Sequence, residues 1–253
     1  MKAVVVTGAS SGLGREFVRQ IGYFYRDLDE IWVFARRRKR LEQLGRESRV
    51  PLRIFDGNLR KKQVYRQYQS ALKEIRPDVR MLVNAAGFGK SGTFSDIASG
   101  SGKTQTDMID LNCRALTRMI QLTLPCMHKG ARIINLASAA AFCPQNGFAV
   151  YAATKAYVLS LSRALSSELR PRGIIVTAVC PGPVDTEFFQ VSGGLTSPLK
   201  KLTLSEAPKV VRKALFDSRK RREVSVYGAA MRAARAGAKL LPHRLILRAE
   251  EIL

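Results

Sequence analysis

A tyrosine and a lysine four residues apart, Tyr151 and Lys155, have the right types and spacing to form an acid/base pair. Residues at this spacing share one face of a helix. A nearby ammonium stabilises a phenolate, so it lowers the pKa of a tyrosine from its free value of about 10. Such a tyrosine can donate a proton to a carbonyl oxygen or remove one from an alcohol. The pair is common by chance, so its meaning depends on the residues around it.

A glycine-rich turn near the start of the chain is typical of a phosphate-binding loop. It follows a short apolar run and precedes an amphipathic stretch. Glycines permit a tight turn and a close backbone approach, and the start of a helix offers free N–H groups. A plain turn is the alternative, because the spacing is looser than the commonest dinucleotide fingerprint. We expect a dinucleotide pyrophosphate to bind at Gly8, Ser10, Ser11, Gly12, Leu13 and Gly14.

Two arginines after the next apolar run, Arg36 and Arg37, bear on which dinucleotide binds. An acid at this point accepts a hydrogen bond from the ribose of NAD, whereas an arginine accommodates the 2′-phosphate of NADP. No Asp or Glu occurs between positions 31 and 41. A guanidinium grips a phosphate in two-point fashion, and a carboxylate would repel it. We therefore predict NADP(H); the alternative is that these arginines only solvate the next helix.

Apolar runs alternate with longer amphipathic stretches along most of the chain. The runs are nearly continuous, as in strands buried on both faces, and span 3–6, 31–35, 52–55, 81–83, 133–136 and 174–179. The helical stretches span 13–25, 38–44, 61–75, 105–124 and 151–169. This alternation predicts a single-domain α/β fold with a doubly wound parallel sheet (Rossmann fold) over residues 1–228. A basic, amphipathic C-terminal helical extension would occupy residues 229–253.

Further residues extend the glycine turn and the Tyr151–Lys155 pair into an ordered set. They are Asp56, then Asn84-Ala85-Ala86-Gly87, Asn112, Ser138, and Pro181-Gly182 with Thr186. In this order the chain strongly resembles the short-chain dehydrogenase/reductase family, from the glycine turn to about residue 227. The tail resembles those of family members thought to act on steroid- or lipid-like substrates. The resemblance implies hydride transfer between NADP(H) and a carbonyl or secondary alcohol.

The resemblance also implies roles for a catalytic centre of four residues. Tyr151 would be the acid/base, and Lys155 would lower its pKa and hold the nicotinamide ribose, with an oxidised nicotinamide adding positive charge. Ser138 would hydrogen-bond the substrate oxygen, and Asn112 would anchor a water in a proton relay. Each residue has an ordinary alternative, such as a helix cap for Ser138 or a polar face residue for Asn112.

The resemblance implies cofactor contacts beyond the glycine turn. Residues 84–87 would steady the sheet and line the cofactor site, Asp56 would meet the adenine ring, and Thr186 would hold the nicotinamide amide. The set is completed by Arg36, Arg37, Gly57, Asn84, Ala85, Ala86, Gly87, Tyr151, Lys155, Pro181, Gly182 and Val184. Two departures stand out. Ser11 replaces a basic residue of some NADP-preferring relatives, and Gly57 replaces the usual small aliphatic residue.

The substrate pocket of the family falls on a set without charge, which favours an apolar substrate such as a hydroxysteroid, a bile acid or an acyl-type ketone. Its residues are Ala140, Phe142, Phe148, Pro183, Phe188 and Phe189. The alternative is that several of them pack the core, because pockets of any kind are mostly apolar.

Charge sets the range of partners. Lys and Arg number 43 against 20 Asp and Glu, a formal net charge of +23. The charge is spread along the chain and no nucleic-acid-binding motif occurs, so we expect no nucleic-acid partner. In the tail, Arg232, Arg235 and Lys239 share a helical face that could lie on an anionic membrane. The tail could equally cover a neighbouring subunit or the substrate mouth. The family resemblance implies a homodimer or homotetramer.

Composition agrees with an intracellular enzyme. The chain has 253 residues, of which 46% are hydrophobic, and no apolar stretch is long enough to suggest a membrane span. The start does not resemble a signal peptide, so we expect a cytoplasmic protein. Its four cysteines and two histidines show no metal-ligand spacing, and no metal is expected.

One competing function belongs to a different class. The chain could be a catalytically silent dinucleotide-binding regulatory module. The intact set of Asn112, Ser138, Tyr151 and Lys155 argues against this interpretation.

Overall fold

The fold is built on a parallel sheet of seven strands in the order β3-β2-β1-β4-β5-β6-β7. It is seen in a computed structural model that describes residues 1–100, 102–188, 192 and 204–252. The strands are β1 (Lys2–Thr7), β2 (Glu30–Ala35), β3 (Leu52–Asp56), β4 (Asp78–Asn84), β5 (Arg132–Leu136), β6 (Ile175–Val179) and β7 (Val224–Ser225). The predicted doubly wound α/β fold is therefore confirmed.

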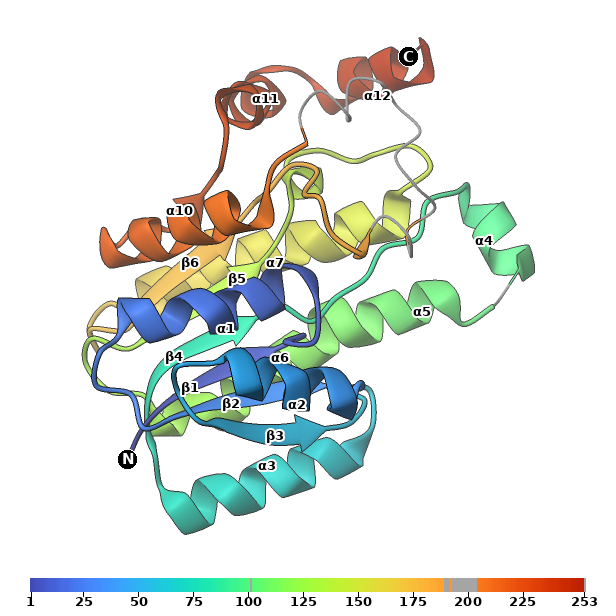
Figure 1. Cartoon of the computed structure of the whole chain (residues 1–253). Coiled ribbons are helices and arrows are strands. Elements are labelled where there is room, and N and C mark those ends of the chain that lie inside the picture. The colour runs from blue at the N-terminus through green and yellow to red at the C-terminus, as the bar shows by residue number, and fades with distance from the viewer. Residues whose placement is uncertain (101, 189–191, 193–203, 253) are drawn as a thin grey trace.

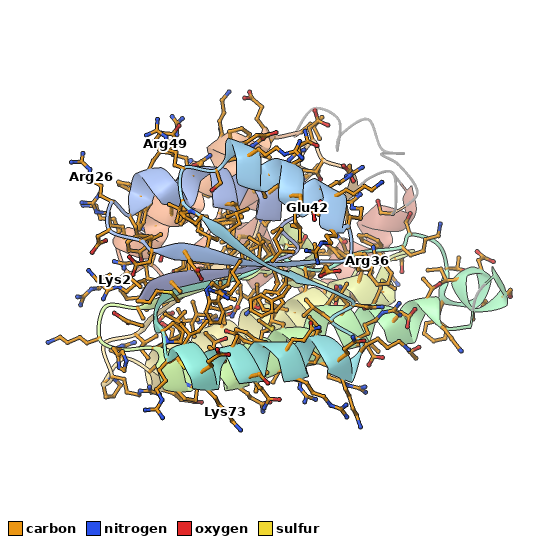
Figure 2. All side chains as sticks on the ribbon, turned by 60° about the horizontal axis from the view of Figure 1, so that its bottom comes forward. Lys2, Arg26, Arg36, Glu42, Arg49 and Lys73 are labelled. Carbon is orange, nitrogen blue, oxygen red and sulfur yellow. The ribbon has the colours of Figure 1, made fainter. Side chains whose placement is uncertain are left out.

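Helices cover both faces of the sheet (Figures 1 and 2). One face packs on α1 (Gly12–Phe24), α2 (Arg38–Glu47) and α10 (Ala207–Arg219). The other packs on α3 (Lys62–Ile75), α6 (Leu116–Thr123) and α7 (Ala149–Glu168). Strand β1 shows why its run is continuously apolar: Val4 and Val6 enter one core, and Ala3 and Val5 enter the other. All four are fully buried.

The long helix predicted over 105–124 is broken into pieces. The chain forms α5 (Thr104–Ile109), a π-helical turn η1 (Asp110–Ala115), α6 and a 3₁₀ turn η2 (Leu124–Cys126). A π-helical turn inserts an extra residue into a helix and is frequent at functional sites. Here it contains Asn112, one of the predicted catalytic residues.

Four further elements were not predicted from the sequence. They are α4 (Phe94–Gly100), the short turn η3 (Ala139–Ala141), α10 and β7. Strand β7 is only two residues long. It forms because β6 offers it a partner: Ala178 pairs with Val224 and Val179 with Ser225. Such a strand has no periodic sequence signal of its own.

The C-terminal segment forms two helices, α11 (Ala229–Leu240) and α12 (His243–Ile252), which lie at the top of Figure 1. Pro242 lies between them, where its ring cannot continue a helix. Whether residues 229–253 act as a separate extension stays a prediction. In the part of the chain that is described, no helix is both long and apolar enough to cross a membrane.

Candidate active site

The glycine turn lies at the carboxyl edge of the sheet, where β1 separates β2 from β4. Strand order reverses here, which is where doubly wound folds bind ligands. Gly8 has a φ of 69°, and a Cβ there would lie 2.7 Å from the nitrogen of Ala86. A Cβ on Gly14 would lie 2.3 Å from the Gly8 oxygen. Ser11 places no side-chain cap on α1, and Leu13 packs inward. The free N–H groups and the close-set backbone fit a pyrophosphate.

Thr7 ties this turn to the segment after β4. Its Oγ1 accepts hydrogen bonds from the backbone N–H groups of Ala85 and Ala86, both at 3.1 Å. Next to them, Asn84 Nδ2 donates to Asn135 Oδ1 at 2.9 Å. Asn135 was not predicted as part of the site, although an asparagine inside a buried apolar strand is an available signal. These bonds hold residues 84–87 in place at the carboxyl edge.

Asn112 stands beside this segment, on η1. Its Nδ2 donates to the Phe88 carbonyl at 2.9 Å and to Thr154 Oγ1 at 3.0 Å. Its Oδ1 accepts from the Phe88 N–H at 3.1 Å. A Cβ on Gly87 would lie only 2.9 Å from that same Oδ1. Both N–H donors of the side-chain amide are thus engaged by protein groups. The predicted water-anchoring role stays a prediction, and a positioning role is added to it.

The predicted acid/base group and its partners come together above the end of β5. Ser138 caps η3, where its Oγ accepts from the Ala140 N–H at 3.1 Å, and its side chain is hydrogen-bonded to Tyr151. Lys155 donates to the Leu136 carbonyl oxygen at 2.7 Å. The Lys155 nitrogen lies 5.6 Å from the centre of the Tyr151 ring. Tyr151 and Lys155 are each only 6% exposed.

Burial governs the acid/base properties of the pair. It raises the pKa of Tyr151 to about 12, although the hydrogen bond with Ser138 acts in the lowering direction. It also lowers the pKa of Lys155 to about 8. The sequence-based expectation that Lys155 lowers the pKa of Tyr151 is therefore not met by the protein alone. Loss of solvent is the largest cause of both shifts, because a buried phenolate and a buried ammonium are both costly.

Aromatic rings surround the Tyr151 side chain. The ring centre of Phe148 lies 4.3 Å from that of Tyr151, and Phe188 lies 5.5 Å away. A Cβ on Gly89 would come within 3.0 Å of all three rings. Gly89 was not predicted as a site residue, and in the sequence it looks like an ordinary loop glycine. The remaining members of the cluster are Ala140, Met108, Ala152, Phe88 and Val150.

Of the predicted pocket residues that the structure describes, Phe142 and Pro183 are not members of this cluster. Phe142 packs against the core on the α3, α6 and α7 face. The Pro183 carbonyl oxygen accepts from the Ser205 N–H at 2.9 Å, which orders the chain after β6. Phe189 lies outside the described residues. Among the described residues of the predicted set, Ala140, Phe148 and Phe188 are the ones gathered around Tyr151.

Pro181 and Gly182, in the segment after β6, lie next to the site. The Pro181 carbonyl oxygen accepts from the Ala139 N–H at 2.8 Å, which ties this segment to η3. A Cβ on Gly182 would lie 2.6 Å from the sulfur of Met231 on α11. Helix α11 therefore lies over this edge of the site, and Met231 is a contact that sequence patterns did not predict.

Farther along, the same segment reaches the glycine turn. Val184 is buried and bridges to Ser205. The side chain of Thr186 approaches Gly12, where an added Cβ would lie 3.4 Å from it. The predicted nicotinamide-holding residue and the predicted pyrophosphate turn are therefore neighbours, although they are far apart in the sequence.

The arginines after β2 differ in their surroundings. Arg37 donates from Nε and Nη2 to Ser10 Oγ, at 3.3 and 3.2 Å. It also pairs with Glu187 at 2.9 Å. Arg36 is exposed, and Figure 2 shows it far from Lys2 and Arg26 at the opposite end of the sheet. Arg37 is thus the arginine that touches the glycine turn, and Glu187 is a neighbour that the sequence did not reveal.

The predicted adenine-contacting residues lie at the end of β3. Asp56 is exposed and pairs with Arg38 at 3.1 Å. The Gly57 N–H donates to the Ala35 carbonyl oxygen at 3.0 Å. Both residues lie on the same edge as the glycine turn.

Comparison with known proteins agrees with this arrangement. The model of the short chain dehydrogenase family matches residues 2–193. The chain belongs to that family. It is 32% identical over 200 residues to sulfoacetaldehyde reductase 2 of Chromohalobacter salexigens, covering 76% of each chain.

Solved structures of this family superpose on nearly the whole chain. A short-chain dehydrogenase from Sphingobium yanoikuyae in complex with NADPH matches with a TM-score of 0.78 and 30% identity, covering 95% of this chain and 94% of that one. The bulky-bulky ketone specific alcohol dehydrogenase from Comamonas testosteroni matches with a TM-score of 0.74 and 25% identity, covering 95% and 92%.

Proposed function

We propose that this chain transfers hydride between NADP(H) and the carbonyl or secondary alcohol of an apolar substrate, such as a hydroxysteroid, a bile acid or an acyl-type ketone. The observation that carries the proposal is the hydrogen-bonded Ser138–Tyr151 pair beneath the rings of Phe148 and Phe188. These hydroxyls can bind a carbonyl oxygen, while the rings offer an apolar surface to the rest of the substrate.

In this proposal the chain's own residues move and hold a proton. A nicotinamide held beside Lys155 and Thr186 would supply the hydride in reduction and accept it in oxidation. Ser138 orients the substrate oxygen, and Tyr151 donates its phenolic proton to that oxygen or takes it back. Because burial raises the Tyr151 pKa to about 12, the side chain is held in the proton-donating form near neutral pH. Lys155 contributes the positive charge next to the ring.

The preference for NADP(H) rests on Arg37. Its guanidinium lies on Ser10 of the glycine turn, and no Asp or Glu follows β2 directly. Arginine at this point suits a 2′-phosphate. The solved NADPH complex of a relative supports the same choice.

The apolar substrate rests on this chain's own side chains, because its relatives differ in substrate. One is named for sulfoacetaldehyde, a small charged aldehyde, and another for bulky ketones. Phe148 and Phe188 pack around Tyr151. Met231 lies against Gly182, at the edge of the site. These neighbours favour a bulky apolar body over a charged one.

The proposal extends to partners and location. Exposed Ile109 and Tyr157, on α5 and α7, support a homodimer or homotetramer through these helices. Leu240, Leu241 and Leu245 are exposed on the basic tail and support a peripheral contact with an anionic membrane. The four free cysteines support a cytoplasmic location.

The test is a substrate screen that follows NADPH absorbance. We expect turnover with hydroxysteroids, bile acids or long-chain ketones, and very little with the same substrates when Tyr151→Phe replaces the native chain. Small charged aldehydes serve as the comparison set. Activity confined to that set would overturn the apolar-substrate part of the proposal, and faster turnover with NADH would overturn the cofactor part.

A further inference from the structure

The carboxylate of Glu187 connects the segment after β6 with the arginines after β2, where the 2′-phosphate of the cofactor is predicted to bind. Glu187, from the segment after β6, accepts a hydrogen bond from Arg37 Nη1 at 2.9 Å through one oxygen. Its other oxygen accepts from Arg40. The two guanidiniums hold the pKa of Glu187 below its usual range, so the carboxylate is charged at neutral pH.

These groups adjoin a basic cavity of about 300 Å³ between α1 and α2. Its lining residues are Ser10, Arg15, Arg19, Arg40, Gln43, Leu44, Glu47 and Glu187. Of the two acids, Glu47 is paired with Arg19 at 2.7 Å. Glu187 is therefore the acid that pairs with Arg37 and Arg40, and Arg37 also contacts Ser10 of the glycine turn.

The two oxygens of Glu187 each accept a hydrogen bond from a guanidinium, one from Arg37 and one from Arg40. A bound phosphate would accept hydrogen bonds from the same N–H groups. We propose that Glu187 is an internal competitor for the 2′-phosphate of the cofactor and so a specificity-determining residue. This inference rests on the proposed NADP(H) function and deepens it. A cofactor with the 2′-phosphate replaces Glu187 on Arg37 and Arg40. A cofactor without it has no anion to offer there, and the ion pairs persist.

The position of Glu187 in the chain couples this exchange to the rest of the site. Its neighbour Thr186 lies against Gly12 and is the residue predicted to hold the nicotinamide amide. When the phosphate displaces Glu187, the segment that contains Thr186 loses its ion pairs with Arg37 and Arg40. Capture of the phosphate and placement of the nicotinamide then become linked steps.

The test uses binding of cofactor fragments, which needs no turnover. Calorimetry would compare adenosine 2′,5′-bisphosphate with adenosine 5′-monophosphate for the native chain, E187Q and E187A. Removing the competitor should tighten the bisphosphate by about two- to fivefold, the range expected for partly exposed ion pairs. The monophosphate should change little. E42Q is the matched control, because it also removes one negative charge, from α2, but the partner of Glu42 is Arg38, which keeps its ion pair with Asp56.

The outcomes separate this inference from the function on which it rests. Weaker or unchanged bisphosphate binding by E187Q and E187A, with NADPH still bound by the native chain, would overturn the competitor role and leave the proposed function standing. A native chain that binds neither NADPH nor the bisphosphate would overturn both. Equal tightening by E42Q would reduce the effect to general electrostatics and would also overturn the inference. In an R37Q background, the effect of E187Q should shrink, because the two residues act on each other.

Discussion

The side-chain amide of Asn112 makes two hydrogen bonds to the backbone of Phe88: Nδ2 donates to the carbonyl oxygen at 2.9 Å, and Oδ1 accepts from the N–H at 3.1 Å. The π-helical turn η1 carries Asn112, so an irregularity in one helix determines the path of the loop after β4. That loop includes Gly87, beside Lys155, and Gly89, beside Tyr151.

Replacing Asn112 should therefore affect stability and activity together. Asn112→Ala leaves the half-buried N–H and carbonyl groups of Phe88 without their partner, at a cost of about 1 kcal/mol or more in the free energy of unfolding. Denaturant unfolding measures the loss, and steady-state kinetics should show a lower kcat. A variant as stable and as active as the native chain would contradict the positioning role.

Tyr151→Phe should remove most of the turnover and leave the fold intact. The substitution removes one hydroxyl and keeps the ring that packs between Phe148 and Phe188. General acid/base catalysis contributes about 10²- to 10⁴-fold, so kcat should fall by a comparable factor. NADPH fluorescence titration should give an almost unchanged Kd. Full activity in this variant would refute the role of Tyr151 as the proton donor.

The pH dependence should follow Lys155. Its pKa is lowered to about 8, so its ammonium is present below that pH and is lost above it. For reduction, kcat/KM should fall as the pH rises through about 8, because the charge beside the Tyr151 ring disappears. Tyrosinate absorbance tests Tyr151, the partner of Lys155. With a pKa of about 12, Tyr151 should lose its proton only at strongly alkaline pH. A profile that stays flat up to pH 10 would rule out this assignment.

Gly89→Ala should narrow the space next to Tyr151. The added methyl group would meet Tyr151 and Phe188 at 2.9 Å and Phe148 at 3.0 Å. Overpacking of this kind costs about 1–3 kcal/mol in stability. The displaced rings would also take up substrate space, so kcat/KM for a bulky substrate should drop about tenfold, a loss of about 1.4 kcal/mol in transition-state binding. Gly100→Ala is the control, because its added methyl group meets nothing within 4 Å. Equal effects of the two substitutions would argue against a pocket at Gly89.

The exposed leucines of the tail should decide whether the chain contacts membranes. Leu240 is 83% exposed, and Leu241 and Leu245 are each 52% exposed. Co-sedimentation with phosphatidylglycerol vesicles should be strong at low salt and weak with neutral vesicles. Changing the three leucines to glutamate should abolish it while activity in solution persists. No sedimentation of the native chain would remove the membrane contact from the proposal.

Much of the architecture was predictable from local sequence. Continuous apolar runs such as 3–6 and 133–136 form central strands because both of their faces are buried, and periodic stretches form the covering helices. The spacing of Gly8, Gly12 and Gly14 marks the turn, since it depends on backbone conformation within one short segment. The ordered motifs identified the family for the same reason: each is a local pattern.

Tertiary structure alone decided what depends on contacts between distant segments. The break at Asn112 has no periodic signal, and Phe142 packs into the core instead of joining Phe148 and Phe188. In the protein alone, burial raises the Tyr151 pKa, which the sequence did not reveal, because spacing reports which charges are near but not how much solvent is lost. The contact of Glu187 with Arg37 joins residues 150 positions apart. Sequence by itself determined the fold, the family and the chemical groups available; folding decided which of those groups touch, and how deeply they are buried.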